Sequence, residues 1–244
     1  CRETLQNVLS DSVYNVRVCF GIYRTDNMNE SLSFMCDKAS FAVASIKDDT
    51  HSFIAYYDDT MLEAAIKYKT IVDEFDDAIK AGEFKMYLQP QISAKTRRLT
   101  GAEALVRRIK PDGTIISPID FIPVYEKSGL ISRLDRYIWE QAAAKLGEWK
   151  KAGINMSISV NISPKDFYYI DIFNTFAGLI KKYDIEPSNL KIEITETTIM
   201  SDVPNLMGEL EELRKAGFTL EMDDFGSGYS SLNTLKDINV DVLK

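Results

Sequence analysis

The chain has few of the residues that build zinc sites, histidine-dependent catalytic sites or disulfide frameworks. Its 244 residues include one histidine, His51, and three cysteines, Cys1, Cys19 and Cys36, whose spacing does not match a metal motif. The single histidine argues against a histidine-based metal site or catalytic triad, and we expect it to be structural. The odd number of cysteines predicts free thiols in a reducing compartment.

Long apolar runs and excess positive charge are also missing. No uninterrupted apolar segment could span a bilayer and no signal peptide is evident, so we expect these residues to be cytoplasmic, although sensory or membrane-anchoring segments could precede Cys1. The formal net charge of -8 argues against broad binding to DNA or RNA, which needs a basic face. An anionic substrate therefore requires cations or metal ions gathered in one pocket.

The composition, 45% hydrophobic and 27% charged residues, is that of a globular α/β protein with one large domain or one domain and part of another. The first segment, residues 1–62, shows a short βαβ pattern, with strand-like alternation at 16–23, helical spacing at 30–46 and a second strand candidate at 52–57. It is too small to close a sheet. Residues 61–81 have a helical pattern, which we expect to bridge two domains.

The remaining sequence alternates between strand and helix periods. Strands are predicted at 84–92, 99–109, 156–162, 190–195, 218–225 and 240–244. Helices are predicted at 118–128, 132–151, 164–183 and 205–216, with a short one near Ser231. This order indicates βα units, a parallel sheet and a TIM-like (β/α) barrel, left incomplete because the sequence stops at the start of the sixth strand.

Each predicted strand after the first carries polar side chains near its carboxyl end. A core strand has no packing reason to hold these groups, and buried carboxylates need protonation, a cation or a metal. In such barrels the carboxyl ends of the strands form one rim, where the chemistry takes place. The candidate ligands are all oxygens, which favours Mg²⁺ or Mn²⁺ over Zn²⁺. The polar residues are Glu103, Arg107, Asn161, Glu193, Glu196, Asp223, Asp224 and Lys244.

Spacing separates the carboxylates within a strand. Glu193 and Glu196 are three residues apart and point to opposite faces unless the strand has ended, so we place Glu193 at the metal and Glu196 above it, holding a loop. Likewise one of Asp223 and Asp224 faces inward, and the other reaches a metal only because the strand turns. The Asp pair alone fits a solvated turn better than a site, and the other polar side chains reverse that preference.

Taken together and in order, these motifs resemble those of the EAL domain family. The resemblance covers residues 72–244 and includes an Asp-Asp-Phe-Gly-Ser-Gly loop in which Gly226 and Gly228 supply the glycines. The motifs are Gln89-Pro90, Glu103-Ala104-Leu105 with Arg107, Ser159 to Ser163, Glu193-Ile194-Thr195-Glu196, Asp223 to Ser231 and Asp241 to Lys244. The family consists of cyclic di-GMP phosphodiesterases and non-catalytic relatives that bind the nucleotide or a protein partner.

The resemblance implies a role for each position. Two ions, Mg²⁺ or Mn²⁺, would be held by Glu103, Asn161, Glu193, Asp223 and Asp224. Lys244 would lie next to the attacking water, and Glu196 would anchor the loop that follows Asp224. Gln89 and Arg107 would bind the nucleotide. Arg108 stands where the family usually has tryptophan, which could alter the packing around Arg107. The implied reaction is hydrolysis of cyclic di-GMP to linear pGpG, and a homodimer through this domain is a further expectation.

A second resemblance concerns the first segment. Residues 1–62 resemble the C-terminal part of a GGDEF, or diguanylate-cyclase-like, domain, without the loop that would report activity, and 63–71 would be a helical linker. We expect the chain to be a fragment of a longer protein and, as written, inactive. Three interpretations stay open: an active phosphodiesterase in the intact protein, a non-catalytic cyclic di-GMP receptor or regulatory module, and an unrelated barrel enzyme or structural remnant.

Overall fold

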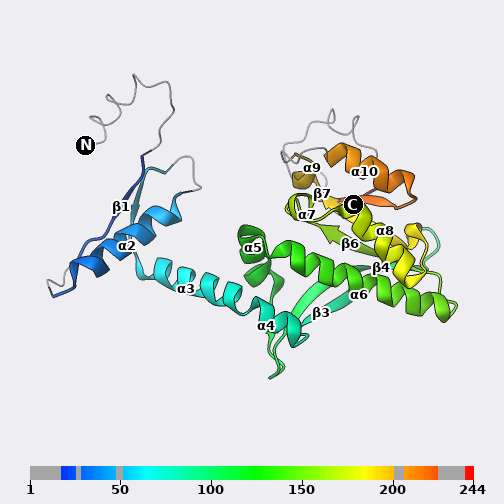
Figure 1. Cartoon of the computed structure of the whole chain (residues 1–244), viewed down its shortest axis with the longest axis horizontal. Coiled ribbons are helices and arrows are strands. Elements are labelled where there is room, and N and C mark those ends of the chain that lie inside the picture. The colour runs from blue at the N-terminus through cyan, green and yellow to red at the C-terminus, as the bar shows by residue number, and fades with distance from the viewer. Residues whose placement is uncertain (1–17, 26–28, 48–51, 201–205, 225–239) are drawn as a thin grey trace, which may run out of the picture. The chain divides into compact units, whose positions relative to one another are not determined.

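The computed structural model describes residues 18–25, 29–47, 52–200, 206–224 and 240–244. The chain divides into two compact units, Cys1–Thr70 and Ile71–Lys244 (Figure 1). Within the described ranges, no helix is both long and apolar enough to cross a membrane. Three predicted features lie outside the described residues. They are the loop with Gly226 and Gly228, the short helix near Ser231, and the structural role of His51.

The first unit contains a small parallel pair of strands and one helix. Strand β1 (Phe20–Ile22) pairs with β2 (Ile54–Tyr56), and the helix α2 (Leu32–Ser45) connects them, as the βαβ pattern predicted. The side chain of Ser31 caps α2 by accepting the Phe34 N–H, which satisfies one of the free donors of the first turn. The buried core of the first unit consists, among the described residues, of Ala42, Ile46 and Ala55.

The second unit contains the larger sheet and its helices. The helices are α4 (Phe75–Lys80), α5 (Pro118–Ser128), α6 (Ile131–Lys151), α7 (Asp166–Tyr169), α8 (Ile172–Tyr183), α9 (Glu196–Met200) and α10 (Leu206–Lys215), with α3 (Asp59–Asp73) leading into α4. The strands are β3 (Phe84–Ile92), β4 (Leu99–Ile109), β5 (Ile115–Ile116), β6 (Ser157–Ile162), β7 (Leu190–Thr195), β8 (Leu220–Asp223) and β9 (Val242–Leu243). The predicted strands and helices agree with these bounds within a few residues, except for the differences that follow.

The sheet is mixed, whereas the sequence pattern predicted a parallel one. Its order is β3-β4-β6-β7-β8-β9, with β5 paired to β4, and the strands from β4 through β6, β7, β8 and β9 are parallel. Both β3 and β5 run antiparallel to β4. The six residues 93–98 between β3 and β4 are too few for the crossover that a parallel pair needs, so they form a hairpin turn in which the Ser93 N–H donates to the Arg98 carbonyl.

Two predicted helices are interrupted and one short helix was not predicted. The helix expected at 61–81 divides at Glu74 into α3 and α4. The helix expected at 164–183 stops at Ile170, whose backbone is extended, and begins again after Asp171, which accepts the Asn174 N–H as an N-cap. The short helix α9 begins at Glu196, between the strand predicted at 190–195 and the helix predicted at 205–216, where no element was predicted.

Helices pack on one face of the parallel strands, and the opposite face carries polar groups. Ile192 and Ile194 on β7 belong to the main hydrophobic core together with Trp139 of α6 and Phe176 of α8. Figure 1 shows α6 lying along the sheet. Because side chains alternate along a strand, Glu193 and its neighbours two residues away project from the other face. The candidate site therefore lies on this opposite face.

Candidate functional site

Strand register brings the predicted polar residues to neighbouring positions on one face of the sheet. Asn161 of β6 pairs with Glu193 of β7, and Glu193 pairs in turn with Glu221 of β8. Glu103 of β4 is opposite Ser159, two residues before Asn161, and its carboxylate lies 3.5 Å from the Asn161 side-chain nitrogen. Parallel pairing thus assembles side chains that are far apart in the sequence.

Lys244 lies among three carboxylates. Its ammonium donates a hydrogen bond to Glu193 and lies 3.6 Å from a Glu103 oxygen and 3.4 Å from a Glu221 oxygen. The backbone N–H of Lys244 donates to the Met222 carbonyl at 2.8 Å, which fixes the end of β9 against β8. Two of the predicted carboxylates, Glu103 and Glu193, therefore both contact the predicted lysine, Lys244.

Burial and neighbouring charge control the protonation of this cluster. Burial, together with the negative charges of Glu103 and Asp223, raises the pKa of Glu193 to about 7, although the Lys244 ammonium opposes the rise. Burial lowers the pKa of Lys244, but its hydrogen bond to Glu193 and the charges of all three carboxylates outweigh that effect and leave it raised. Three carboxylates, those of Glu103, Glu193 and Glu221, share the two ammonium groups of Lys191 and Lys244, so one more cation is favourable here.

The strand end at Asp223 opens into a large cavity. Asp223 and Asp224 line it, and Asp224 has a left-handed backbone with φ of 57°, so the chain turns at Asp224. The cavity has a volume of about 680 Å³, enough for a nucleotide-sized ligand. Polar side chains that line it include Glu103, Arg107, Asn161, Lys165, Thr195, Thr197, Asp223 and Asp224.

The two predicted nucleotide-binding residues differ in their positions. Arg107 lines the cavity, and its guanidinium donates to the carbonyl of Val106 at 2.8 Å. Gln89 is on β3 directly opposite Glu103, but its exposed side chain is not among those that line the cavity. Arg108 points to the other face, where it is buried and paired with Glu74 and Glu83, so it does not share the surroundings of Arg107.

Glu196 is buried at the first position of α9, directly after β7 ends at Thr195. It therefore lies beyond the end of the strand that carries Glu193. The loop that it was expected to hold begins at residue 225, outside the described part of the chain. Its role as a loop anchor stays a prediction.

Two further charged residues on the same face were not predicted from the sequence. Lys191 and Glu221 lie two residues before Glu193 and Asp223, and their side chains form an ion pair of 2.9 Å. Only 2% of the Glu221 side chain is exposed. The signal was available, because period-2 alternation places residue 191 with Glu193 and residue 221 with Asp223, but neither lies at the carboxyl end of its strand.

The donor set suits a hard divalent ion, although the described side chains do not already form a ligand cluster. Among the described residues, no three Asp, Glu, His or Cys side chains are gathered closely enough to hold an ion. One oxygen of Glu193, Oε1, is nonetheless buried and has no hydrogen-bond partner among those residues. A desolvated carboxylate oxygen without a partner, with carboxylate and amide oxygens beside it, fits Mg²⁺ or Mn²⁺.

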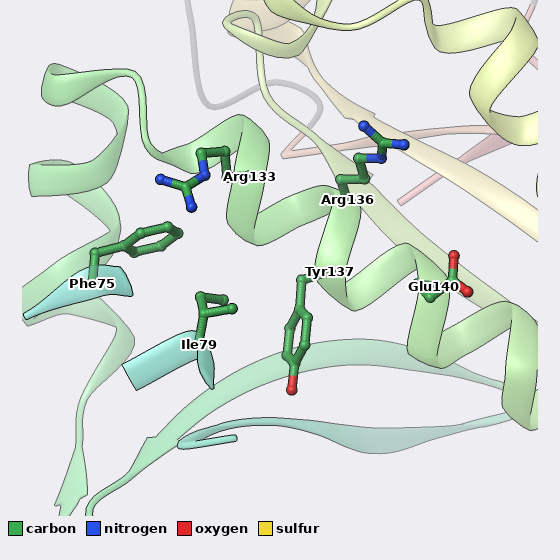
Figure 2. Close-up of a pocket in the computed structure, with 6 residues that line it drawn as sticks. All are labelled: Phe75, Ile79, Arg133, Arg136, Tyr137 and Glu140. Atoms are coloured by element: carbon green, nitrogen blue, oxygen red, sulfur yellow. The ribbon is translucent and has the colours of Figure 1, made fainter. Parts of the chain in front are cut away.

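A second, smaller cavity of about 270 Å³ lies between α4 and α6. Figure 2 shows its lining side chains, among which the Arg133 guanidinium lies over the Phe75 ring at 5.0 Å. Arg133 also pairs with Asp76 at 2.6 Å. This cavity contains none of the predicted site residues, so the larger cavity is the candidate site.

The fold and site define a class: an α/β domain in which carboxylate and amide side chains border a cavity large enough for a nucleotide. The chain belongs to the EAL domain family, whose model matches residues 72–244. It is 32% identical over 207 residues to "Signaling protein YkoW" of Bacillus subtilis, a match that covers 85% of this chain and 26% of that protein. It is 29% identical over 207 residues to "Bifunctional diguanylate cyclase/cyclic di-GMP phosphodiesterase MucR" of Pseudomonas aeruginosa, covering 84% of this chain and 30% of that protein.

The fold is also similar to that of solved EAL domains. The structure described as "PaMucR Phosphodiesterase, c-di-GMP complex" matches with a TM-score of 0.67 and 30% identity, covering 71% of each chain. The present chain spans only about a quarter to a third of the length of the curated relatives named above.

Proposed function

We propose that the protein containing this chain is a metal-dependent phosphodiesterase that hydrolyses cyclic di-GMP to linear pGpG in bacterial signalling. The observation that carries the proposal is the meeting of Glu103 of β4, Glu193 of β7 and Lys244, the residue after β9, where Glu103 lines a cavity of about 680 Å³. The printed descriptions of MucR as a phosphodiesterase and of its complex with c-di-GMP support the same substrate. An incomplete TIM-like barrel, with residues 1–62 from a GGDEF-like domain, belongs to this proposal.

Each side chain has a distinct part in the proposed reaction. Two Mg²⁺ or Mn²⁺ ions, when bound, lower the pKa of a water molecule and stabilise negative charge on the attacking and leaving oxygens. Glu103, Asn161, Glu193 and Asp223 are the proposed ligands of the first ion, and Asp223 and Asp224 contribute to the second. The Lys244 ammonium orients the attacking water, and Arg107 binds a phosphate through its guanidinium. Gln89 contacts the nucleotide, and Glu196 steadies the loop after Asp224.

The test is to incubate the full-length natural protein with cyclic di-GMP and Mg²⁺ or Mn²⁺ and to quantify pGpG by liquid chromatography. Glu103→Gln and Glu103→Ala should lower turnover by at least about 100-fold, because each removes a charged ligand. Chelation of the metal should stop the reaction. Circular dichroism should show an unchanged fold for both variants.

Glu212→Gln on α10 is the matched control, because it removes an exposed carboxylate that does not line the cavity and should keep full turnover. Nucleotide binding without hydrolysis by the wild-type protein would instead favour a cyclic di-GMP receptor. Full activity of Glu103→Ala would show that the metal assignment is wrong.

A further inference from the structure

Glu221 is a buried carboxylate that the proposed reaction does not use. It lies on β8 two residues before Asp223, at the strand position directly opposite Glu193. Its Oε1 pairs with the Lys191 ammonium at 2.9 Å, and its side chain is 2% exposed. A charged carboxylate removed from water this completely needs compensation, and the Lys191 ammonium supplies it here.

The second oxygen of Glu221 faces Lys244. Oε2 is buried and lies 3.4 Å from the Lys244 ammonium, within ion-pair distance, yet it makes no hydrogen bond with the described residues. The hydrogen bond of Lys244 goes instead to Glu193. Glu221 therefore presents an unused acceptor to a lysine whose backbone is already fixed against Met222.

The other two carboxylates around Lys244 are the proposed metal ligands Glu103 and Glu193. Coordination to a divalent ion draws electron density from a carboxylate and weakens it as a hydrogen-bond acceptor for Lys244. Glu221 is the acceptor of the three that has no part in metal binding, and Lys191 prevents it from turning away. We propose that Glu221, held by Lys191, is a positioning residue that keeps the Lys244 ammonium directed at the reacting water while the ions are bound.

This inference rests on the proposed function for its kinetic consequence, but the contact itself can be tested separately. In the full-length protein with saturating Mg²⁺, acetylation of each lysine by a water-soluble active ester can be measured by mass spectrometry. Glu221→Gln should raise the labelling rate of Lys244 by at least about threefold, because the amide loses the ion pair that holds the amine. Lys150, which pairs with Asp184 on the exposed surface, should be unaffected.

The kinetic arm separates positioning from metal binding. Glu221→Gln should lower kcat by about 10-fold or more, with KM and the affinity for Mg²⁺, measured by calorimetry, changed less than about threefold. Lys191→Met should act in the same direction because it frees the Glu221 side chain. The double variant should lose less than the product of the two single effects, since both act through one contact.

The results of these measurements distinguish a failure of the positioning role of Glu221 from a failure of the proposed hydrolysis of cyclic di-GMP. Unchanged Lys244 labelling in both Glu221→Gln and Lys191→Met overturns the positioning role, and so does a loss of Mg²⁺ affinity of 10-fold or more, which would make Glu221 a metal ligand. Greater labelling in a protein whose wild type does not hydrolyse cyclic di-GMP supports the contact and refutes the proposed activity. A thermal unfolding scan of each variant shows that the fold is kept.

Discussion

At the scale of single residues, an unusual pair outside the carboxylates around Lys244 is that of Asp135 on α6 and Asp166 on α7. Asp166 is fully buried and accepts the Ser163 N–H at 2.7 Å. Burial raises the pKa of Asp166 to about 6, and burial together with the charge of Asp166 raises the pKa of Asp135 well above its ordinary value. Glu126 adds further negative charge, so the folded protein favours a shared proton.

This pair predicts a stability that falls as the pH rises. The folded-state pKa of Asp166 exceeds its ordinary value of 3.8, so its contribution is complete below about pH 3.8 and is lost as the pH rises through about 6. Asp166→Asn cannot ionise and keeps an acceptor for Ser163. The free energy of unfolding of Asp166→Asn minus that of the wild type should therefore increase by roughly 1–3 kcal/mol between pH 4.5 and pH 8.

Urea unfolding followed by circular dichroism at several pH values measures this difference. Asp77→Asn is the control, because 89% of its side chain is exposed. That variant should differ from the wild type by the same small amount at every pH. A difference for Asp166→Asn that does not change with pH would contradict the shared proton.

Among the structural elements, α4 is attached to β4 by a buried arginine. Arg108 is 3% exposed and reaches Glu74, the residue before α4, at 2.7 Å and Glu83, the residue before β3, at 2.9 Å. Its guanidinium lies 5.7 Å from the centre of the Phe84 ring. One side chain thus connects the entrance of α4 and the start of β3 to the outer face of the strand whose other face carries Arg107.

Removing this connection should destabilise the larger unit. Arg108→Met leaves the poorly exposed Glu83 carboxylate without a partner, and the free energy of unfolding should fall by about 3 kcal/mol. Glu74→Gln should cost only about 1 kcal/mol, because 37% of that side chain is exposed to water. Lys80→Met breaks an exposed pair with Asp77 and should change the value by less than about 0.5 kcal/mol. Chemical denaturation tests this order, and equal effects of the first two variants would contradict it.

The sequence predicted elements better than it predicted how they pair or where charges meet. Asn161 and Glu193 were singled out because each is a polar residue in an apolar strand near its carboxyl end, whereas Glu103 stands in the middle of β4. The strand β3 was predicted, but its antiparallel direction was missed because periodicity does not report strand direction. The short connection at 93–98 does indicate that direction. The partners of Arg108 are 34 and 25 residues away along the chain, and only the fold brings them together.

At the scale of the whole molecule, the two units differ in how much apolar surface they bury. In the described residues, the core of the first unit consists of Ala42, Ile46 and Ala55, two of which have the smallest apolar side chain. The core of the second unit includes large aromatic residues such as Trp139 and Phe176. Because apolar burial supplies most of the stability of a fold, we expect the first unit of this chain to open much more readily.

Hydrogen exchange of the 244-residue chain measures this difference. After correction for the intrinsic rate of each sequence, the amides of α2 should exchange at least about 100-fold faster than those of β6 and β7, because opening the small core exposes little apolar surface. Peptides from α10, which packs Leu210 and Leu213 into the main core, are the internal control and should resemble the strands. Equal protection of α2 and the strands would mean that contacts beyond the three buried residues stabilise the first unit.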